Sequence, residues 1–137
     1  MISIELIRSD PDTVRRAAKL RGDDVPLDRI LDLDTRRRGI ITEADTLRAR
    51  RNEVSRDLGR TGEKPPEMIS EMRRVGAQIK SLEADARSVD DELNPLLLMV
   101  PNIPDPGVPV GSGEDENVLL RSAGEMPSFD FEPLPHW

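Results

Sequence analysis

Between residues 27 and 98, apolar positions recur at alternating steps of three and four, with one interruption near the middle. Before the interruption they are Ile30, Leu33, Ile40, Ala44, Leu47, Val54 and Leu58, with Arg37 and Arg51 in the two remaining positions of the series. After it they are Met68, Met72, Val75, Ile79, Leu82, Ala86, Val89, Leu93 and Leu96. A sustained period of about 3.5 residues is typical of a coiled-coil seam, so the pattern predicts two long helices.

The interruption is the segment 59–66, which reads Gly-Arg-Thr-Gly-Glu-Lys-Pro-Pro. Its glycines favour the end of one helix, and proline fits the first turn of the next. The predicted helices therefore span 27–58 and 67–98, each about 48 Å long at 1.5 Å per residue. Two helices of equal length joined by a short turn are expected to fold back on each other. The predicted fold class is all-α, built on an antiparallel coiled-coil hairpin.

A shorter helix is predicted before the hairpin. Asp10 offers a capping oxygen, Pro11 fits a first helical turn, and Gly22 favours the end of a helix. We expect this helix over about 11–21, packed on the base of the hairpin, and a short turn or strand around Ile4, Leu6 and Ile7.

The residues after the hairpin change character. Pro95 should kink or stop the second helix near Asn94, although the apolar residues that follow favour one further helical turn against the base. Residues 101–113 contain four prolines and three glycines, which predicts an extended segment. A short strand is expected at 118–120.

These features divide the chain into a helical arm, 1–100, and a segment 101–137 that links the arm to a further domain. Phe129, Phe131 and Trp137 need a core that this chain does not supply. We therefore expect the chain to be a fragment of a longer protein.

Composition narrows the possible chemistry. Aromatic residues make up 2% of the chain and charged residues 34%, which suits a two-helix rod better than a thick globular core. The absence of cysteine excludes disulfides and thiolate metal sites, and a single histidine, His136, excludes a histidine cluster or a catalytic triad. No Gly-rich phosphate loop is present, and carboxylate pairs on such helices are most simply solvated. We predict no catalytic residue, cofactor or metal site in this chain.

No signal pattern begins the sequence, and no apolar run approaches the roughly 20 residues that span a membrane. A cytoplasmic location without membrane contact is expected.

The net charge of −7 is unevenly distributed. Residues 48–80, which form the outer half of the predicted hairpin, contain nine Lys and Arg against five Asp and Glu. Residues 81–99 contain one basic residue against five acidic ones, and residues 100–137 contain one against seven. The outer half of the hairpin is therefore basic, while the base and the tail are acidic.

This basic region is the candidate binding site. Its residues are Arg48, Arg50, Arg51, Asn52, Arg56, Arg60, Lys64, Arg73, Arg74 and Lys80. Guanidinium groups can engage two phosphate oxygens at once, and a rigid rod would hold them at fixed spacing. No aromatic residue lies near the tip, so contacts to a nucleic acid should be made to its backbone and shape.

Two alternatives remain open for these residues. The charges could belong to a salt-bridged coiled-coil surface, with the stems of Arg37 and Arg51 covering the seam while their charged groups reach water. The hairpin could then be a protein-interaction or scaffold arm without RNA binding, for which Met68 and Met72 hint at an apolar groove.

Several short motifs resemble one family. In chain order they are Leu6-Ile7-Arg8 before Asp10-Pro11, Leu33-Asp34 before Arg36-Arg37, Arg51-Asn52-Glu53-Val54-Ser55-Arg56, Val100-Pro101-Asn102-Ile103-Pro104, Val108-Pro109-Val110-Gly111, Glu116-Asn117-Val118, Phe129-Asp130-Phe131 and Pro135-His136-Trp137. In this order and spacing, they resemble the amino-terminal part of bacterial seryl-tRNA synthetases. Arg56 departs from that family, which more often carries Lys there, and the tip is rather short.

The resemblance implies that the hairpin is a tRNA-binding arm, which grips the long variable arm and elbow of serine tRNA. It implies a parent enzyme that is a homodimeric class II serine–tRNA ligase, which uses ATP and Mg²⁺ and whose three catalytic motifs lie beyond Trp137. A paralogue that kept the arm but lost serylation is a further alternative.

Overall fold

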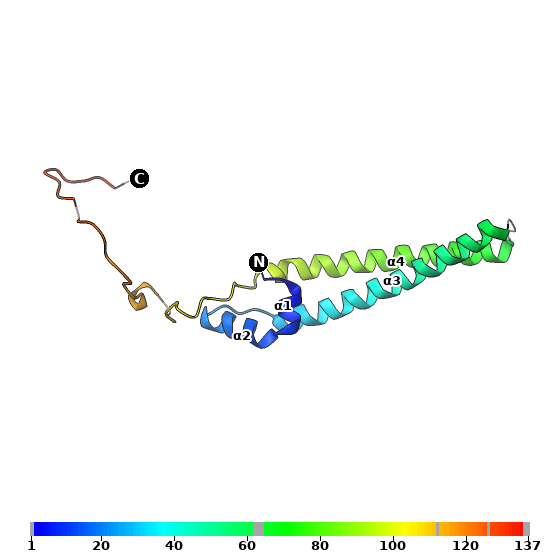
Figure 1. The fold of residues 1–137 in the computed structure, drawn as a ribbon, viewed down its shortest axis with the longest axis horizontal. Coiled ribbons are helices and arrows are strands. Elements are labelled where there is room, and N and C mark those ends of the chain that lie inside the picture. The colour runs from blue at the N-terminus through cyan, green and yellow to red at the C-terminus, as the bar shows by residue number, and fades with distance from the viewer. Residues whose placement is uncertain (1, 62–64, 112, 126, 136–137) are drawn as a thin grey trace.

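The computed structural model describes residues 2–61, 65–111, 113–125 and 127–135. Its elements are α1 (Ile4–Ser9), α2 (Pro11–Leu20), α3 (Leu27–Thr61), α4 (Pro66–Leu98) and a 3₁₀ turn, η1 (Glu114–Glu116). Helices α3 and α4 lie side by side as a long arm, with α1 and α2 at its base (Figure 1). After α4 the chain runs away from the base as an extended segment.

The predicted antiparallel hairpin is confirmed, with small differences at the turn. Helix α3 continues through Gly59, because one glycine in a helix costs only about 1 kcal/mol relative to alanine. Pro66 begins α4, as the Pro-Pro pair predicted. The middle of the predicted turn, 62–64, lies outside the described residues.

Helix α4 does not stop at Asn94, and it includes Pro95 as an interior residue. The further helical turn is confirmed. Leu96 and Leu97 are half-buried against the base, and this burial offsets the backbone hydrogen bond that proline cannot donate.

At the amino terminus, the structure confirms one prediction and corrects another. Helix α2 begins at Pro11 as predicted, and Asp10 caps it by accepting hydrogen bonds from the Thr13 backbone N–H at 3.0 Å and the Thr13 hydroxyl at 2.6 Å. The turn or strand expected around Ile4 is instead the short helix α1. Ser3 caps this helix, since its hydroxyl accepts from the Leu6 N–H at 3.2 Å.

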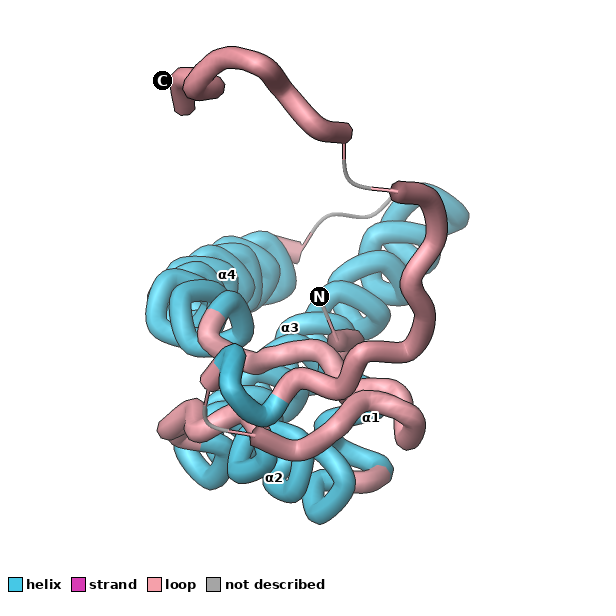
Figure 2. Tube along the Cα trace, turned by 90° about the vertical axis from the view of Figure 1, so that its left-hand side faces the viewer, coloured by secondary structure: helices cyan, strands magenta, loops and turns pink. Residues whose placement is uncertain are grey.

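The hydrophobic core lies at the base of the arm, where all four α-helices gather (Figure 2). Its buried residues come from α1, α2, α3, α4 and the residues that flank them, namely Ile7, Val14, Leu27, Ile30, Leu33, Val89, Leu93 and Val100. Towards the tip the seam becomes thinner. Ala44, Val75 and Ile79 are buried, whereas Val54 and Leu58 are only half-buried. The arm is therefore held mainly from its base.

The strand expected at 118–120 is not present, and the described residues between 101 and 135 contain no strand. Leu119 and Leu120 are 83% and 89% exposed. A strand needs a neighbouring strand to accept and donate its backbone hydrogen bonds, and no described segment lies in that position. The described part of the segment predicted as extended, 101–113, contains no helix or strand, but it turns at Asp105–Val108, where the Val108 N–H donates to the Asp105 carbonyl at 3.0 Å.

A buried carboxylate joins α1 to α3. Asp34 is only 2% exposed, and it accepts hydrogen bonds from Arg8 Nε at 2.9 Å, Arg8 Nη2 at 3.1 Å and Arg38 Nε at 3.1 Å. Burial raises the pKa of Asp34, but the hydrogen bonds and positive charges of Arg8 and Arg38 outweigh it and hold that pKa below its usual value. This cluster clamps the short first helix onto the arm.

We expect Asp34→Asn to lower the free energy of unfolding by about 2 kcal/mol at pH 7, because it removes a buried charge that two arginines contact. This is below the usual cost of breaking a buried pair, since Arg8 and Arg38 are partly solvated. Urea denaturation measures the change. The control Asp32→Asn removes an exposed carboxylate that pairs with Arg29 at 3.3 Å and should change the free energy by less than about 0.5 kcal/mol. Equal losses would contradict the clamp.

The clamp also predicts a pH dependence. Because the folded-state pKa of Asp34 lies below its unfolded value of roughly 3.9, its stabilisation is present above that pH and is lost as pH falls through the folded-state pKa. The stability difference between wild type and Asp34→Asn should therefore shrink below about pH 4. Urea midpoints between pH 2 and pH 7 measure it, and a constant difference would contradict this prediction.

Candidate nucleic-acid interface

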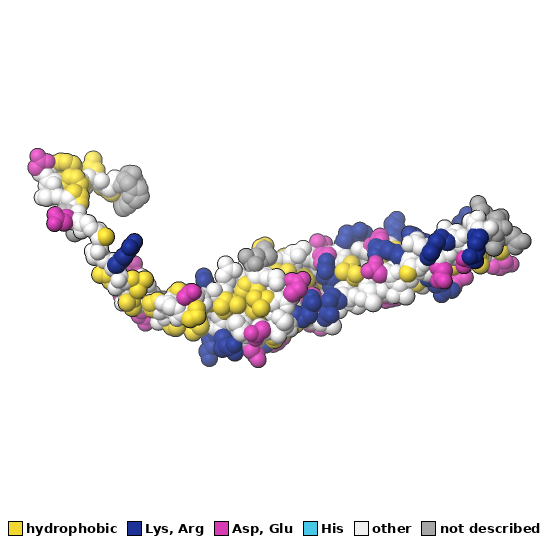
Figure 3. All heavy atoms as spheres, viewed as in Figure 1, with side chains coloured by type: hydrophobic (Ala, Val, Ile, Leu, Met, Phe, Trp, Pro, Cys, Tyr) yellow, Lys and Arg dark blue, Asp and Glu magenta, His cyan; other side chains and the backbone are white. Residues whose placement is uncertain are grey.

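Nine of the ten predicted binding residues lie on the described part of the arm, and Lys64 lies outside it. Arg48, Arg50, Arg51, Asn52, Arg56 and Arg60 belong to α3, and Arg73, Arg74 and Lys80 belong to α4. Figure 3 shows Lys and Arg side chains at intervals along the arm, with Asp and Glu among them. Ion pairs between the two helices therefore decide which of these cations are available to a partner.

Two ion pairs across the seam define the two long sides of the outer arm. On one side, Arg48 Nη2 of α3 contacts Glu83 Oε1 of α4 at 2.6 Å. On the other side, Arg50 of α3 contacts Glu71 of α4. Residues seven apart on a coiled-coil helix return to the same side, and residues three or four apart are neighbours. The remaining residues can therefore be assigned to one side or the other.

We name these sides after their arginines. The Arg48 side comprises Asp45, Arg48, Asn52 and Ser55 of α3, and Ile69, Arg73, Gly76, Lys80, Glu83 and Arg87 of α4. The Arg50 side comprises Arg50, Glu53, Asp57 and Arg60 of α3, and Glu67, Glu71, Arg74 and Asp85 of α4. Within residues 45–60 and 67–87, the Arg48 side thus has four cations against two carboxylates, whereas the Arg50 side has three against five. The next carboxylate on the Arg48 side towards the base, Asp90, is in an ion pair with Arg37.

The cations of the two sides also differ in their partners. Arg50 and Arg60 are in ion pairs, Arg60 with Asp57 at 3.2 Å. Within the described part of the chain, Arg73, Lys80 and Arg87 are exposed and have no ion pair. These three charges are free to meet an anionic partner.

Arg48 is the exception on its own side. It contacts Glu83 and, at 2.6 Å, Asp45. The hydrogen bonds that Arg48 donates to Glu83 and Asp45 raise the pKa of Arg48. The alternative of a salt-bridged coiled-coil surface therefore fits Arg48, Arg50 and Arg60, which are in ion pairs. It does not fit the cations of α4 on the Arg48 side, which are not.

A groove opens between the helices near the tip. It has a volume of about 320 Å³ and is lined by Arg51, Ser55 and Leu58 of α3 and by Ile69, Met72 and Arg73 of α4. Arg51 occupies a seam position but is exposed, and it lines this groove together with Arg73. The seam arginine adds one further cation to the Arg48 side.

The structure leaves four predicted residues apart from the Arg48 side: Arg50 and Arg60, which are in ion pairs on the Arg50 side, and also Arg56 and Arg74. Arg56 lies on the outer face of α3, where its Nε donates to the Asn52 carbonyl at 3.4 Å. Arg74 lies on the Arg50 side, beside Glu67 and Glu71. Arg87, which was not among the ten predicted residues, is exposed and lies seven residues after Lys80 and fourteen after Arg73, on the same side.

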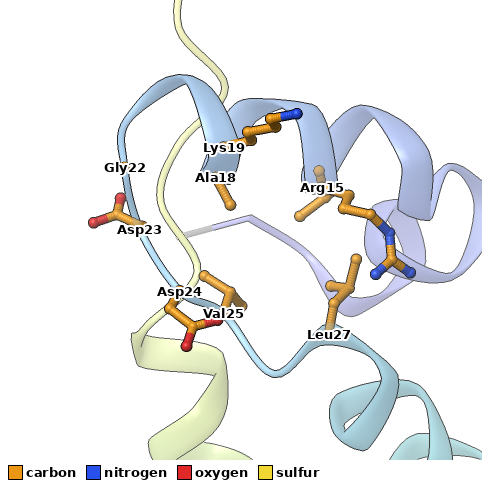
Figure 4. A pocket seen from close by; sticks show the side chains of 9 residues that line it. Arg15, Ala18, Lys19, Gly22, Asp23, Asp24, Val25 and Leu27 are labelled. Carbon is orange, nitrogen blue, oxygen red and sulfur yellow. The ribbon is translucent and has the colours of Figure 1, made fainter. Parts of the chain in front are cut away.

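In the described residues, neither a metal cluster nor the cavity at the base of the arm competes with this site. They contain no group of three or more carboxylate, histidine or cysteine side chains that could hold a metal ion. No helix among them is long and apolar enough to cross a membrane. A cavity of about 380 Å³ lies at the base between α2 and residues 22–27, but its charged side chains diverge (Figure 4). Polar groups that converge on one point, as a small ligand requires, are absent from it.

A packed helical base that carries a long hairpin of two helices defines the chain as a helical domain with a coiled-coil arm. Comparison with known families supports this class, because the family model of the seryl-tRNA synthetase N-terminal domain matches residues 1–104. The chain belongs to this family, and the resemblance drawn from its motifs is confirmed.

The relatives that align with this chain are longer than it is. Serine–tRNA ligases from Exiguobacterium sibiricum and Dehalococcoides mccartyi are 43% and 44% identical to it, over 141 and 137 residues, and align with all of it. The chain spans about a third of their length, 33% and 32%. A crystal structure of seryl-tRNA synthetase from Pyrococcus horikoshii complexed with ATP superimposes with a TM-score of 0.72 at 31% identity. That match covers 86% of this chain and 28% of the other.

The division into paired and unpaired cations predicts different effects on folding. Arg73→Gln should leave the Tm unchanged within about 1 °C, because Arg73 has no ion pair among the described residues. Arg48→Gln should lower the Tm by about 2 °C, since it removes contacts to Asp45 and Glu83. Thermal unfolding followed by circular dichroism measures both. A larger loss for Arg73→Gln would show that this residue has a structural role.

Proposed function

We propose that this chain is the tRNA-binding arm of a serine–tRNA ligase, and that it binds the long variable arm and elbow of serine tRNA. The observation that carries the proposal is the row of exposed, unpaired cations on the Arg48 side of an arm that belongs to this family. The ten residues predicted from the sequence remain candidates for the interface. Of these, Arg51, Asn52, Arg73 and Lys80, which lie on the Arg48 side or at the groove, carry this proposal, and Lys64 lies outside the described part.

The chemistry of these residues suits phosphate. An exposed cation without an ion pair can approach an RNA backbone without first giving up a carboxylate, so little of the binding free energy is lost. The helices hold Arg73 and Lys80 on a rigid surface, which limits the entropy lost on binding. The described residues of α3 and α4 include no aromatic side chain, so base stacking contributes little and the contacts go to backbone and shape.

The whole enzyme supplies the reaction. We infer a cytoplasmic homodimeric class II ligase whose catalytic domain follows residues 1–100 and the linker that begins at Pro101. ATP, Mg²⁺ and serine would bind in that domain. Its own role is to hold the tRNA in place for serylation.

The groove beside Leu58, Ile69 and Met72 favours the alternative of a protein-interaction arm, because apolar side chains line it. Two arginines border the same groove, however, and it is small compared with a stable protein interface. A binding experiment decides between the two.

We expect the 137-residue chain to bind a tRNA with a long variable arm more tightly than a tRNA that lacks one, because only the first offers a second helical stem to the cationic side. Fluorescence anisotropy in 50 mM salt measures both affinities. Phosphate contacts release counterions, so the affinity should fall by tenfold or more between 50 mM and 200 mM salt.

The tRNA without the long variable arm serves as the matched control for general attraction to RNA. No binding to either RNA in 50 mM salt would contradict the proposal and favour the protein-interaction alternative. Equal affinity for the two would contradict recognition of the long variable arm.

A further inference from the structure

The three unpaired cations of α4 form a regular row. Arg73, Lys80 and Arg87 are seven residues apart, so they lie on the same side of the arm at intervals of about 10.5 Å. All three are exposed. The row runs from the groove near the tip towards the base, and Arg87 extends it beyond the ten candidate residues.

The opposite side would repel phosphate. Its five carboxylates are Glu53, Asp57, Glu67, Glu71 and Asp85, and two of its three cations are already in ion pairs. A charged partner that approaches the arm therefore meets attraction on one long side and repulsion on the other. The difference in charge is large enough to select a side, even though both sides contain arginines.

The Arg48 side also carries a glycine and short polar side chains between its cations. Gly76 lies between Arg73 and Lys80, and a Cβ added there would meet no atom within 4 Å. Packing therefore does not require glycine at this position, where alanine would favour the helix by up to about 1 kcal/mol. Without a side chain, the helix backbone is open to close approach. Asn52 and Ser55, which are short polar residues, are exposed on the same side in α3.

From this we propose that an RNA strand runs along α4 on the Arg48 side, that its phosphates contact Arg73, Lys80 and Arg87, and that the Arg50 side faces away from the RNA. The inference rests on the proposed function. It assigns the side of the arm that binds, the path of the strand along α4 and one further contact residue, Arg87.

Two triple variants of the 137-residue chain test this directly. One carries Arg73→Gln, Lys80→Gln and Arg87→Gln, and the matched control carries Arg50→Gln, Arg60→Gln and Arg74→Gln. Each removes three positive charges from the outer arm, so a general loss of charge affects both equally. Circular dichroism verifies that both remain helical.

We expect the first variant to bind a tRNA with a long variable arm at least tenfold more weakly than wild type in 50 mM salt. Its plot of log affinity against log salt should be shallower by about 2 to 3, since each lost phosphate contact removes about 0.7 to 0.9 from the slope. The control should lose less than about threefold, with an unchanged slope. A variant with Arg73→Lys, Lys80→Arg and Arg87→Lys keeps the charges and should retain binding.

A control variant that binds as weakly as the first, or more weakly, would overturn the assignment of the side while leaving the proposed function in place. A wild-type chain that binds neither RNA would instead overturn the proposed function, and this inference with it.

A second test changes shape without changing charge. Gly76→Leu places a bulky side chain on the Arg48 side, whereas Ala77→Leu places the same side chain on the exposed outer face of α4. Only Gly76→Leu should weaken binding, by about fivefold or more. Equal affinities for the two variants would overturn the inferred path of the strand.

Discussion

Two helices that pack side by side can bury only the side chains that face each other, so a long hairpin depends on what holds its base together. Ile30, Leu33 and Val89 are fully or almost fully buried where α1 and α2 cover the seam, whereas Val54 and Leu58 are only half-buried near the tip. The carboxylate of Asp34, which is held by two arginines, fixes α1 onto α3 at the same end. The base therefore carries the stability, and the outer arm extends from it.

The seam buries few side chains in the outer arm, so most of its charged residues are exposed to water and contribute little to the stability of the fold. Exposed ion pairs contribute little to stability, so the seam sets the fold while the residues beside it are free to differ from one side to the other. The two sides of the arm differ in how many of their cations are in ion pairs. Arg50 and Arg60 are paired on the acidic side, and Arg73 and Lys80 remain unpaired on the cationic side.

The seam period predicted the hairpin to within a few residues, because that period is a direct consequence of which side chains face the partner helix. Helix α1 has only six residues, too few to show a period. The strand at 118–120 was predicted from apolar residues alone, but a strand also depends on a neighbour that the sequence does not reveal. The basic residue types of the site were predictable. Their pairing was not, because Glu71 and Glu83 lie 21 and 35 residues from the arginines they contact.

The two seam arginines show how the role of one residue type changes along the arm. Arg37, nearer the base, is half-buried, and its Nε donates to Asp90 across the seam. Arg51, nearer the tip, is exposed, has no ion pair among the described residues, and borders a groove with Ile69 and Met72 instead of a carboxylate. The same side chain therefore helps to fix the register at the base and is available to a partner at the tip. This difference between Arg37 and Arg51 follows from the residues that α4 places opposite each of them, and it leaves a cation available for binding on the outer arm.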